Sequence, residues 1–346
     1  MRHSSSIASL ALTIVLALAI VTPAKADLVL TAAGIADGFT LTQFVGGYNF
    51  GGGANYGPLA QGILPDGNVV TGSFGSGQIY VFQDTDSQNL ASAVSATIYA
   101  SPFSGGQWAM TTAGGQAYGA RQSGVYEQIA NNGSFTPIPN LQGNGLFSSQ
   151  GMWGDPINGH IIAASNKGLV EIDPLAGTFR VINGSLIGNI DGVTLSPDGS
   201  TVYVANIGLG IVQSYNFATG ALIQSYSTTS GRGPDGTGVI SGGSLNGDVI
   251  VNNNDGTVGL LNPVTNVYTI IANAGTRGDW VSPDTSNGTL FVSQSDSVDR
   301  LSCGPDCSIG GPPPSTVPEP SSVALLGIGL VASFASLRRK LPKQRQ

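Results

Sequence analysis

A polar residue recurs just before an alternating apolar strand in six segments of this 346-residue sequence. Carboxylate, amide and hydroxyl oxygens at such positions can bind a polar ligand or a cation. If the six strands converge, the polar side chains face one shared cavity; otherwise they satisfy nearby backbone groups. The candidate binding residues are Gln61, Gln107, Gln150, Asp191, Thr237 and Asp279.

Two of these candidates, Asp191 and Asp279, carry carboxylates and could share a divalent cation such as calcium across the cavity. Three tryptophans, Trp108, Trp153 and Trp280, follow the polar positions within their segments. Their rings could stack on sugars, although packing in the core explains them more simply.

Several common catalytic mechanisms lack support in this sequence. His160 is the one histidine beyond residue 26 and opens a predicted strand, which disfavours a Ser-His-Asp triad and excludes a His-rich metal site. The Gly-x-Gly-x-x-Gly match at 231–236 precedes no helical pattern, which a dinucleotide site would require. Catalytic residues therefore stay unassigned.

Cys303 and Cys307 are the only cysteines. Two thiolates cannot complete a zinc site alone. In an exported protein we expect them to form a small disulfide loop.

The elements that would position the polar residues recur about every 44 residues, close to the length of a β-propeller blade. Each repeat contains a hairpin turn whose glycine tolerates positive φ, followed by two short alternating strands. The turn glycines are Gly67, Gly115, Gly159, Gly199, Gly247 and Gly288.

This spacing predicts an all-β protein with a six-bladed β-propeller over residues 27–301; uneven spacing would have favoured a β-sandwich. The sixth repeat ends before its outermost strand. We expect Gly38–Val45 near the N-terminus to supply that strand and close the ring. Residues 302–317 are interpreted as a Cys/Pro-rich linker.

Composition agrees with a turn-dense β protein. Glycine occurs 51 times, about twice its usual share, while charged residues make up only 10%. Such a chain is neither helical nor disordered through charge. The net charge is −7, but the six basic and 19 acidic residues between Asp27 and Val317 give −13, which disfavours nucleic-acid binding.

Both ends are predicted targeting segments. Residues 1–26 have a basic start, an apolar run and the small-x-small site Ala24–Ala26, which is typical of a secretory signal peptide. At the other end, residues 318–346 contain Pro318, Glu319 and Pro320, then the apolar run Val323–Leu337 and a basic cluster. The apolar run can form a short transmembrane helix with its basic end in the cytoplasm.

This C-terminal arrangement closely resembles the PEP-CTERM sorting signal of exopolysaccharide-producing Gram-negative bacteria. The resemblance covers about Val317–Lys340 and implies processing by an exosortase near Pro318–Pro320 and release to the cell surface. The protein would contact the membrane and the secretion machinery before processing. A permanent membrane anchor is the alternative.

The fourth and fifth repeats resemble those of six-bladed gluconolactonase (SMP-30-like) and NHL-type propellers, through Asp191–Asn206 and Gly233–Gly236. In the lactonases a glutamate, an asparagine and an aspartate hold a divalent cation. The corresponding positions here are Tyr56, Asp191 and Asp235, so only Asp191 and Asp235 are candidate metal ligands. The glutamate is missing, which weakens the case for lactone hydrolysis.

The sequence thus favours an exported, non-catalytic surface or matrix protein that recognises a glycan or another surface protein. The alternative is a metal-dependent hydrolase of the lactonase type with a degenerate site.

Overall fold

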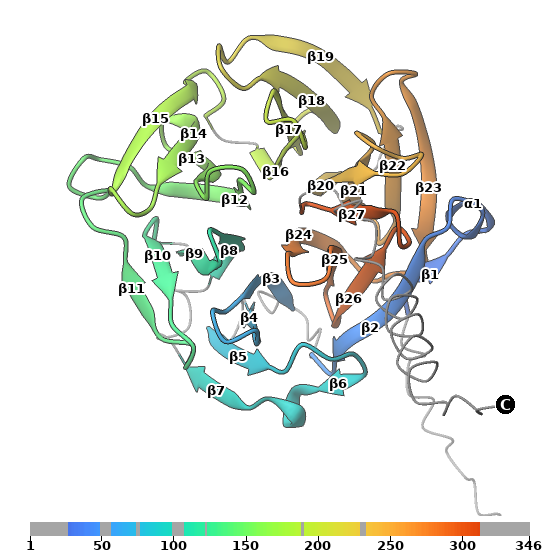
Figure 1. Cartoon of the computed structure of the whole chain (residues 1–346), viewed down its shortest axis with the longest axis horizontal. Helices are drawn as coiled ribbons and strands as arrows, with labels where there is room; N and C mark the ends of the chain where they lie inside the picture. Colours follow the sequence, from blue (N-terminus) through green and yellow to red (C-terminus); the bar gives the residue numbers. More distant parts are fainter. Residues whose placement is uncertain are drawn as a thin grey trace, which may run out of the picture.

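The structure, a computed structural model, describes residues 27–48, 57–73, 77–98, 107–121, 123–187, 190–228 and 233–311. Within these ranges the strands form six sheets that stand around a common axis (Figure 1). The expected six-bladed β-propeller is therefore confirmed. The predicted signal peptide, 1–26, and the predicted sorting signal, 318–346, lie outside the described residues.

The first three blades each contain four antiparallel strands, numbered outward from the axis. Blade 1 comprises β3 (Pro58–Ile63), β4 (Val69–Ser73), β5 (Gln78–Phe82) and β7 (Ser95–Ile98). Blade 2 comprises β8 (Gln107–Ala113), β9 (Gln116–Arg121), β10 (Tyr126–Ile129) and β11 (Phe135–Pro137). Blade 3 comprises β12 (Ser148–Gly154), β13 (Ile161–Ser165), β14 (Gly168–Asp173) and β15 (Thr178–Asn183).

The other three blades have the same four-stranded plan, and two of them draw on the N-terminal segment. Blade 4 comprises β16 (Ile190–Leu195), β17 (Thr201–Asn206), β18 (Ile211–Asn216) and β19 (Leu222–Ser227). Blade 5 comprises β20 (Pro234–Gly242), β21 (Val249–Asn253), β22 (Val258–Asn262) and β23 (Val267–Asn273), with β1 (Val29–Leu30) outside β23. Blade 6 comprises β24 (Gly278–Asp284), β25 (Thr289–Gln294), β26 (Ser297–Ser302) and β2 (Thr40–Gly46).

The hairpins between the first and second strands form as the sequence predicts. All six predicted turn glycines have positive φ, for example 84° at Gly67 and 76° at Gly159. A residue with a Cβ is strained in this region of φ, whereas glycine is not. In the turn of blade 1, Asp66 accepts a hydrogen bond from the backbone of Asn68. These turns set the register of the blades.

The ring closes through the N-terminal strand. β2 pairs antiparallel with β26, from Thr40 opposite Ser302 to Gly46 opposite Ser297, which confirms the predicted role of this segment. The short strand β6 (Gln88–Asn89) extends from blade 1 and pairs parallel with β2. A 3₁₀ turn, Leu90–Ser92, follows β6, and the helix α1 (Ala32–Ala36) precedes β2. Blades 1 and 6 are thereby joined through backbone hydrogen bonds.

The segment after the last blade belongs partly to the body. Cys303 and Cys307 form a disulfide, and β27 (Cys307–Ile309) pairs antiparallel with the end of β20. Residues 302–317 are therefore not linker throughout, because their first part has backbone partners. No helix in the described ranges is long and apolar enough to cross a membrane.

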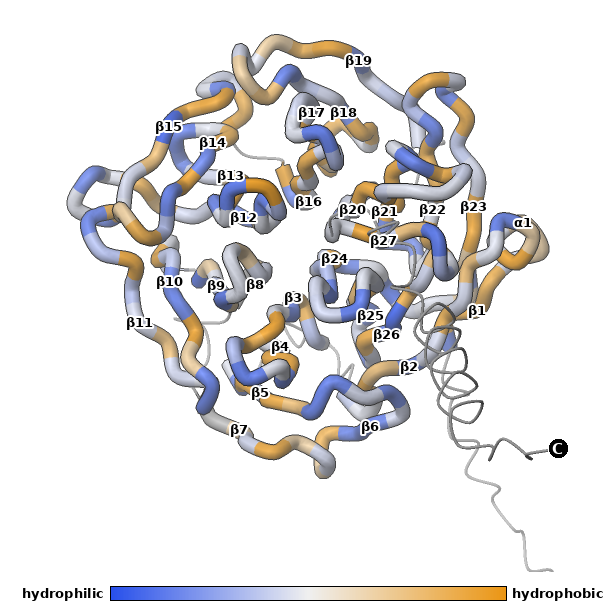
Figure 2. Tube along the Cα trace, viewed as in Figure 1, coloured by the Kyte–Doolittle hydropathy of each residue, from blue (hydrophilic) through white to orange (hydrophobic). Residues whose placement is uncertain are grey.

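The hydrophobic core is distributed around the ring. Figure 2 shows apolar residues in every blade rather than in one part of the molecule. Inner strands are buried on both faces: all five residues of β4, β13 and β21 are buried. Adjacent blades pack against each other through these residues, because each of these strands contacts the innermost strand of the next blade.

Candidate functional site at the mouth of the ring

The mouth is the end of the ring at which the innermost strands begin. Near its start each of these innermost strands has a β-bulge: its register against the second strand of the blade shifts, because the innermost strand has more residues there than its partner. In blades 4 to 6 the first extra residue is an aspartate. These residues are Asp191, Asp235 and Asp279, which directly follow the pairs Ile190–Asn206, Pro234–Asn253 and Gly278–Gln294.

The registers correct part of the sequence-based alignment. Gln150, Asp191 and Asp279 occupy equivalent positions at the bulge of their blades. Relative to this position, Gln61 and Thr237 lie two residues further along their strands, and Gln107 lies one residue before it. The physical reason is that hairpin and strand lengths differ between blades: β20 has nine residues where β16 has six. Counting back a fixed number of residues from the turn glycine therefore reaches positions that are not equivalent in different blades.

Asp235 is the residue that this alignment missed in blade 5. The lactonase resemblance had singled it out for another reason. A usable signal is the repeated dipeptide, because Asp191-Gly192 and Asp235-Gly236 start the same bulge.

Glycine at these two positions lets the inner strands approach closely. A Cβ on Gly192 would lie 2.2 Å from the carbonyl oxygen of Asp235, and one on Gly236 would lie 2.6 Å from the backbone nitrogen of Val281. Both distances are shorter than any tolerable contact, so a side chain would push the blades apart. The glycines thus bring the three aspartates together.

Trp280 takes the corresponding position in blade 6. Its indole nitrogen donates to the backbone oxygen of Asp191, two blades away, at 3.0 Å. It also belongs to the same buried cluster as Leu59, Ala60 and Met110 of blades 1 and 2. Trp280 therefore packs across the ring axis beneath the aspartates, which is a structural role and not a free stacking surface. Trp153 is likewise buried in the core.

The three aspartates are buried and incompletely paired. Their exposed fractions are 4% for Asp191, 3% for Asp235 and 4% for Asp279. One oxygen of each carboxylate (Oδ1, Oδ1 and Oδ2, respectively) is buried and has no hydrogen-bond partner within the described ranges. Buried polar atoms are usually satisfied, so three unsatisfied oxygens at equivalent positions distinguish this site from the rest of the core.

A guanidinium group faces these three carboxylates. Arg277 places Nη2 at 3.2 Å from Oδ1 of Asp279 and at 4.0 Å from Oδ2 of Asp235. Its Nε donates to Oδ1 of Asn254 at 2.6 Å. The formal charge of these four groups is negative when all are ionised, because three carboxylates face one guanidinium.

Burial and mutual repulsion raise the pKa of each aspartate. Burial, with the charge of Asp279, raises the pKa of Asp191 to about 7 against the opposing effect of Arg277. Burial raises the pKa of Asp279 to about 6, also against Arg277. Burial and the other two carboxylates raise the pKa of Asp235 well above its ordinary value. The cluster therefore holds protons near neutral pH that isolated aspartates would release.

The remaining predicted site residues lie elsewhere on the innermost strands. Gln61 is fully buried and donates from Nε2 to Ser293 at 3.0 Å, between blades 1 and 6. Thr237 is buried with a hydroxyl that has no partner in the described part of the chain. Gln150 is half-buried in β12, and Gln107 begins β8.

The residues do not fit the divalent cation that the lactonase resemblance implies. Asp191 and Asp235 lie close together, but the guanidinium of Arg277 already lies beside Asp235 and Asp279. Among the residues that the structure describes, no three His, Cys, Asp or Glu side chains are arranged to hold a metal ion. The third implied position, Tyr56, lies outside these residues.

Comparison with known families concerns the C-terminal end. Residues 316–340 match the family described as the PEP-CTERM protein-sorting motif. The chain carries an exosortase sorting signal. This signal indicates an exported surface protein that an exosortase processes and that is attached to the membrane. Pro318, Glu319 and Pro320 lie within the match.

Comparison with solved structures concerns the propeller. The fold is similar to an auxiliary nutrient binding protein from Bacteroides thetaiotaomicron (TM-score 0.51, 10% identity, 76% of each chain covered). It is also similar to a catalytically inactive variant of virginiamycin B lyase from Staphylococcus aureus, with quinupristin (TM-score 0.51, 13% identity, 76% of this chain and 99% of that one). A third similar structure is the WD40 β-propeller domain of Doa1 (TM-score 0.50, 13% identity, 70% of this chain and 77% of that one).

At these identities the similarity shows the propeller fold and not a shared activity. No curated protein sequence matches the chain significantly.

Proposed function

We propose that this protein is a non-catalytic binding module displayed at the cell surface, and that its mouth recognises a hydroxyl-rich ligand such as a glycan. The observation that carries this proposal is the set of three equivalent aspartates in consecutive blades, each with a buried oxygen that lacks a partner among the described residues. A ligand that donates hydrogen bonds to these oxygens would remove the cost of leaving them unsatisfied.

The chemistry of the cluster favours neutral, donor-rich ligands. Carboxylates accept pairs of hydrogen bonds from neighbouring hydroxyl groups, and Arg277 can donate to a ring or hydroxyl oxygen. Phosphate or another anion would meet three aspartates and one arginine, which disfavours nucleic acid and anionic polymers.

The position of the C-terminal exit supports presentation of the mouth. The opposite end of the ring, where the hairpins between first and second strands lie, is the hairpin face. β27 pairs with Ile240–Gly242 at the hairpin end of β20, and the nitrogen of Gly310 donates to the carbonyl of Val239. The last described residues therefore lie at the hairpin face, opposite the mouth, which is consistent with a mouth that stays accessible.

The proposal includes the finer targeting steps. Residues 1–26 act as a signal peptide, and the protein reaches the surface of a Gram-negative bacterium. The combination of an apolar N-terminal run and the C-terminal sorting signal supports this route. A secreted chain whose sequenced N-terminus is Asp27 would agree with it, and retention of residues 1–26 would contradict it.

A glycan array tests the binding function directly. The full chain in detergent should bind at least one neutral glycan, and the double substitution Asp191→Asn and Asp235→Asn should weaken that binding about tenfold or more. The matched control Asp66→Asn changes the same charge in an exposed hairpin of blade 1 and should leave binding unchanged. Absence of any bound glycan, or equal binding by the double variant, would overturn the proposal.

The second candidate is the hydrolase of the lactonase resemblance, which would use Asp191 and Asp235. These two carboxylates interact at the mouth, although Arg277 lies beside Asp235 and disfavours a cation there. Elemental analysis of the purified chain separates the two candidates. One equivalent of calcium, magnesium or zinc that Asp235→Asn removes would favour the hydrolase. A protein that carries no such metal after equilibration with it would exclude this alternative.

A further inference from the structure

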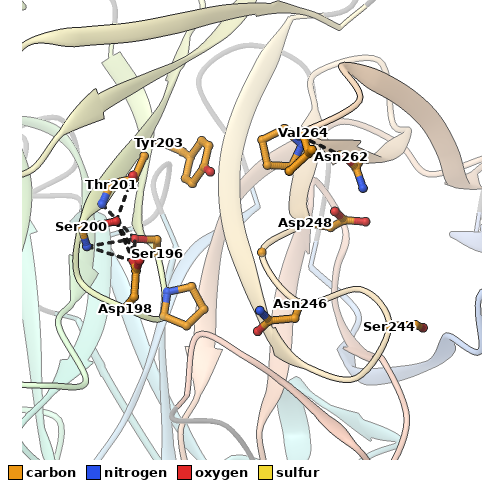
Figure 3. Close-up of a pocket in the computed structure, with 13 residues that line it drawn as sticks. Ser196, Asp198, Ser200, Thr201, Tyr203, Ser244, Asn246, Asp248, Asn262 and Val264 are labelled. Carbon is orange, nitrogen blue, oxygen red and sulfur yellow. Dashed lines mark hydrogen bonds between the residues drawn. The ribbon is translucent and has the colours of Figure 1, made fainter.

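A polar cavity lies on the hairpin face between blades 4 and 5, at the opposite end of the ring from the aspartates of the mouth. Its volume is about 310 Å³, which is enough for one monosaccharide-sized molecule. One wall comes from the hairpin of blade 4 and the start of β17; the other comes from two turns of blade 5. Figure 3 shows Asp198 and Tyr203 on the first wall and Asp248, Asn246 and Asn262 on the second.

Asp248 is the unusual group of this cavity. It is 6% exposed, and its carboxylate forms no hydrogen bond or ion pair with any residue that the structure describes. Burial and the charge of Asp37 raise the pKa of Asp248 to about 6, so it is mostly ionised at pH 7. Its carboxylate oxygens are not among the buried atoms that lack a partner, so they are open to the cavity and can pair with an external cation or donor there.

The other lining groups define what that ligand offers. Asp198 is ionised and already accepts hydrogen bonds from Ser196 and Ser200, which lower its pKa. The amide oxygens of Asn246 and Asn262 accept from backbone nitrogens, which leaves the NH₂ groups of these two lining residues available as donors. The lining residues, all of them described, include no Lys, Arg or His. The cavity thus combines negative charge with amide donors.

An equivalent cavity between blades 2 and 3 provides an internal comparison. Its volume is about 390 Å³, and Tyr118 lines it where Tyr203 lines the first. At the position of Asp248 this cavity has His160, because Asn158-Gly159-His160 corresponds to Asn246-Gly247-Asp248. The ring nitrogen Nδ1 of His160 lies 2.7 Å from Glu171, so this side chain already has a partner.

We propose that the cavity between blades 4 and 5 binds a protonated primary amine that also carries hydroxyl groups, such as an amino-sugar residue. The ammonium pairs with Asp248, and the hydroxyl groups accept from Asn246 and Asn262 and contact Tyr203. The cavity between blades 2 and 3 does not bind this ligand, since His160 stands at the position of Asp248. Its one carboxylate, Asp173, already accepts hydrogen bonds from the backbone of Leu175 and Ala176. The proposal is independent of the function assigned to the mouth.

Calorimetric titration of the full chain in detergent at pH 7 tests this site with three probes of similar size: glucosamine, N-acetylglucosamine and glucose. Glucosamine should bind at least about tenfold more tightly than the two uncharged sugars, and Asp248→Asn should abolish that preference. The matched control His160→Asn, at the equivalent position of the other cavity, should leave it intact. Asp191→Asn should also leave it intact, which separates this site from the mouth.

Three results would overturn the proposal. These are no binding of glucosamine, equal binding of glucosamine and N-acetylglucosamine, or an unchanged preference in an Asp248→Asn variant. If Asp248→Asn fails to fold, as judged by its β-sheet circular dichroism, binding of glucosamine and of N-acetylglucosamine to the unmodified chain still tests whether the site recognises the charged amine.

Discussion

Two clusters of one arginine and three aspartates lie in this propeller, and they differ in how completely they are paired. At the junction of blades 6 and 1, Arg300 contacts Asp84, Asp86 and Asp284. At the mouth, Arg277 faces Asp191, Asp235 and Asp279. The composition is the same in both, so the difference arises from geometry alone.

The cluster at the junction is well satisfied. Arg300 donates to all three carboxylates, and its guanidinium lies over the rings of Phe44 and Phe291 at 5.2 and 4.8 Å. The remaining carboxylate oxygens accept from neighbouring side chains and backbone. These donors are Thr42 for Asp86, Ser286 for Asp84, and Ser286 with Asn287 for Asp284.

The cluster at the mouth is not satisfied, since three buried carboxylate oxygens there have no partner in the described ranges. Buried charges without hydrogen bonds destabilise a fold, whereas fully paired ones can hold two elements together. We infer that Arg300 serves to close the ring, and that the mouth retains its unpaired oxygens for a ligand. The two clusters thus differ in pairing and not in residue type.

Replacing Arg300 should have the largest effect on stability. Arg300→Met leaves three carboxylates without this cation, and that of Asp284 is fully buried; removing one partner of a buried ion pair costs about 3–5 kcal/mol. We expect the midpoint of thermal unfolding at pH 8 to fall by roughly 10 °C, measured by circular dichroism. If this variant does not fold, Asp86→Asn should lower the midpoint by a smaller amount. An unchanged midpoint in both variants would contradict the structural role.

Replacing Arg277 should have a smaller effect that depends on pH. At pH 8 Asp191 and Asp279 are largely ionised, and Arg277→Met removes the guanidinium that faces them; we expect the midpoint to fall by about 2–6 °C. At pH 5 the raised pKa values keep Asp191 and Asp279 largely protonated, so the decrease should be much smaller. Equal decreases at pH 5 and pH 8 would show that the carboxylates do not repel each other as described.

The propeller could be predicted from the sequence because its signals are local. Turn glycines such as Gly67 and Gly199 need positive φ, and the alternating strands that follow them are buried in the blades. The closing strand was also predictable, since the sixth repeat lacks its outermost strand and Thr40–Gly46 fits that place.

The candidate site could be predicted only in part. Asp191 and Asp279 are visible as polar residues before apolar strands, but the equivalence of Asp235 depends on the length of β20 and its bulge. Arg277 and Asn254 were not found because they precede or connect strands, and their proximity to the aspartates follows from how blades 5 and 6 pack. The cavity with Asp248 also requires two adjacent blades, which no single repeat reveals.

The central claim is that the carboxylates of the junction are paired and stabilise the fold, whereas those of the mouth are unpaired and destabilise it. It is most directly tested by replacing one aspartate with asparagine in each cluster. The pKa of Asp191 rises from 3.8 to about 7 on folding, so its contribution to stability is present at low pH and is lost as pH rises toward and through 7. At pH 8, Asp191→Asn should therefore raise the midpoint of thermal unfolding by about 2–4 °C, whereas Asp84→Asn should lower it. At pH 4 the gain from Asp191→Asn should disappear. If both substitutions lower the midpoint equally at pH 8, the two clusters are alike and the account is wrong.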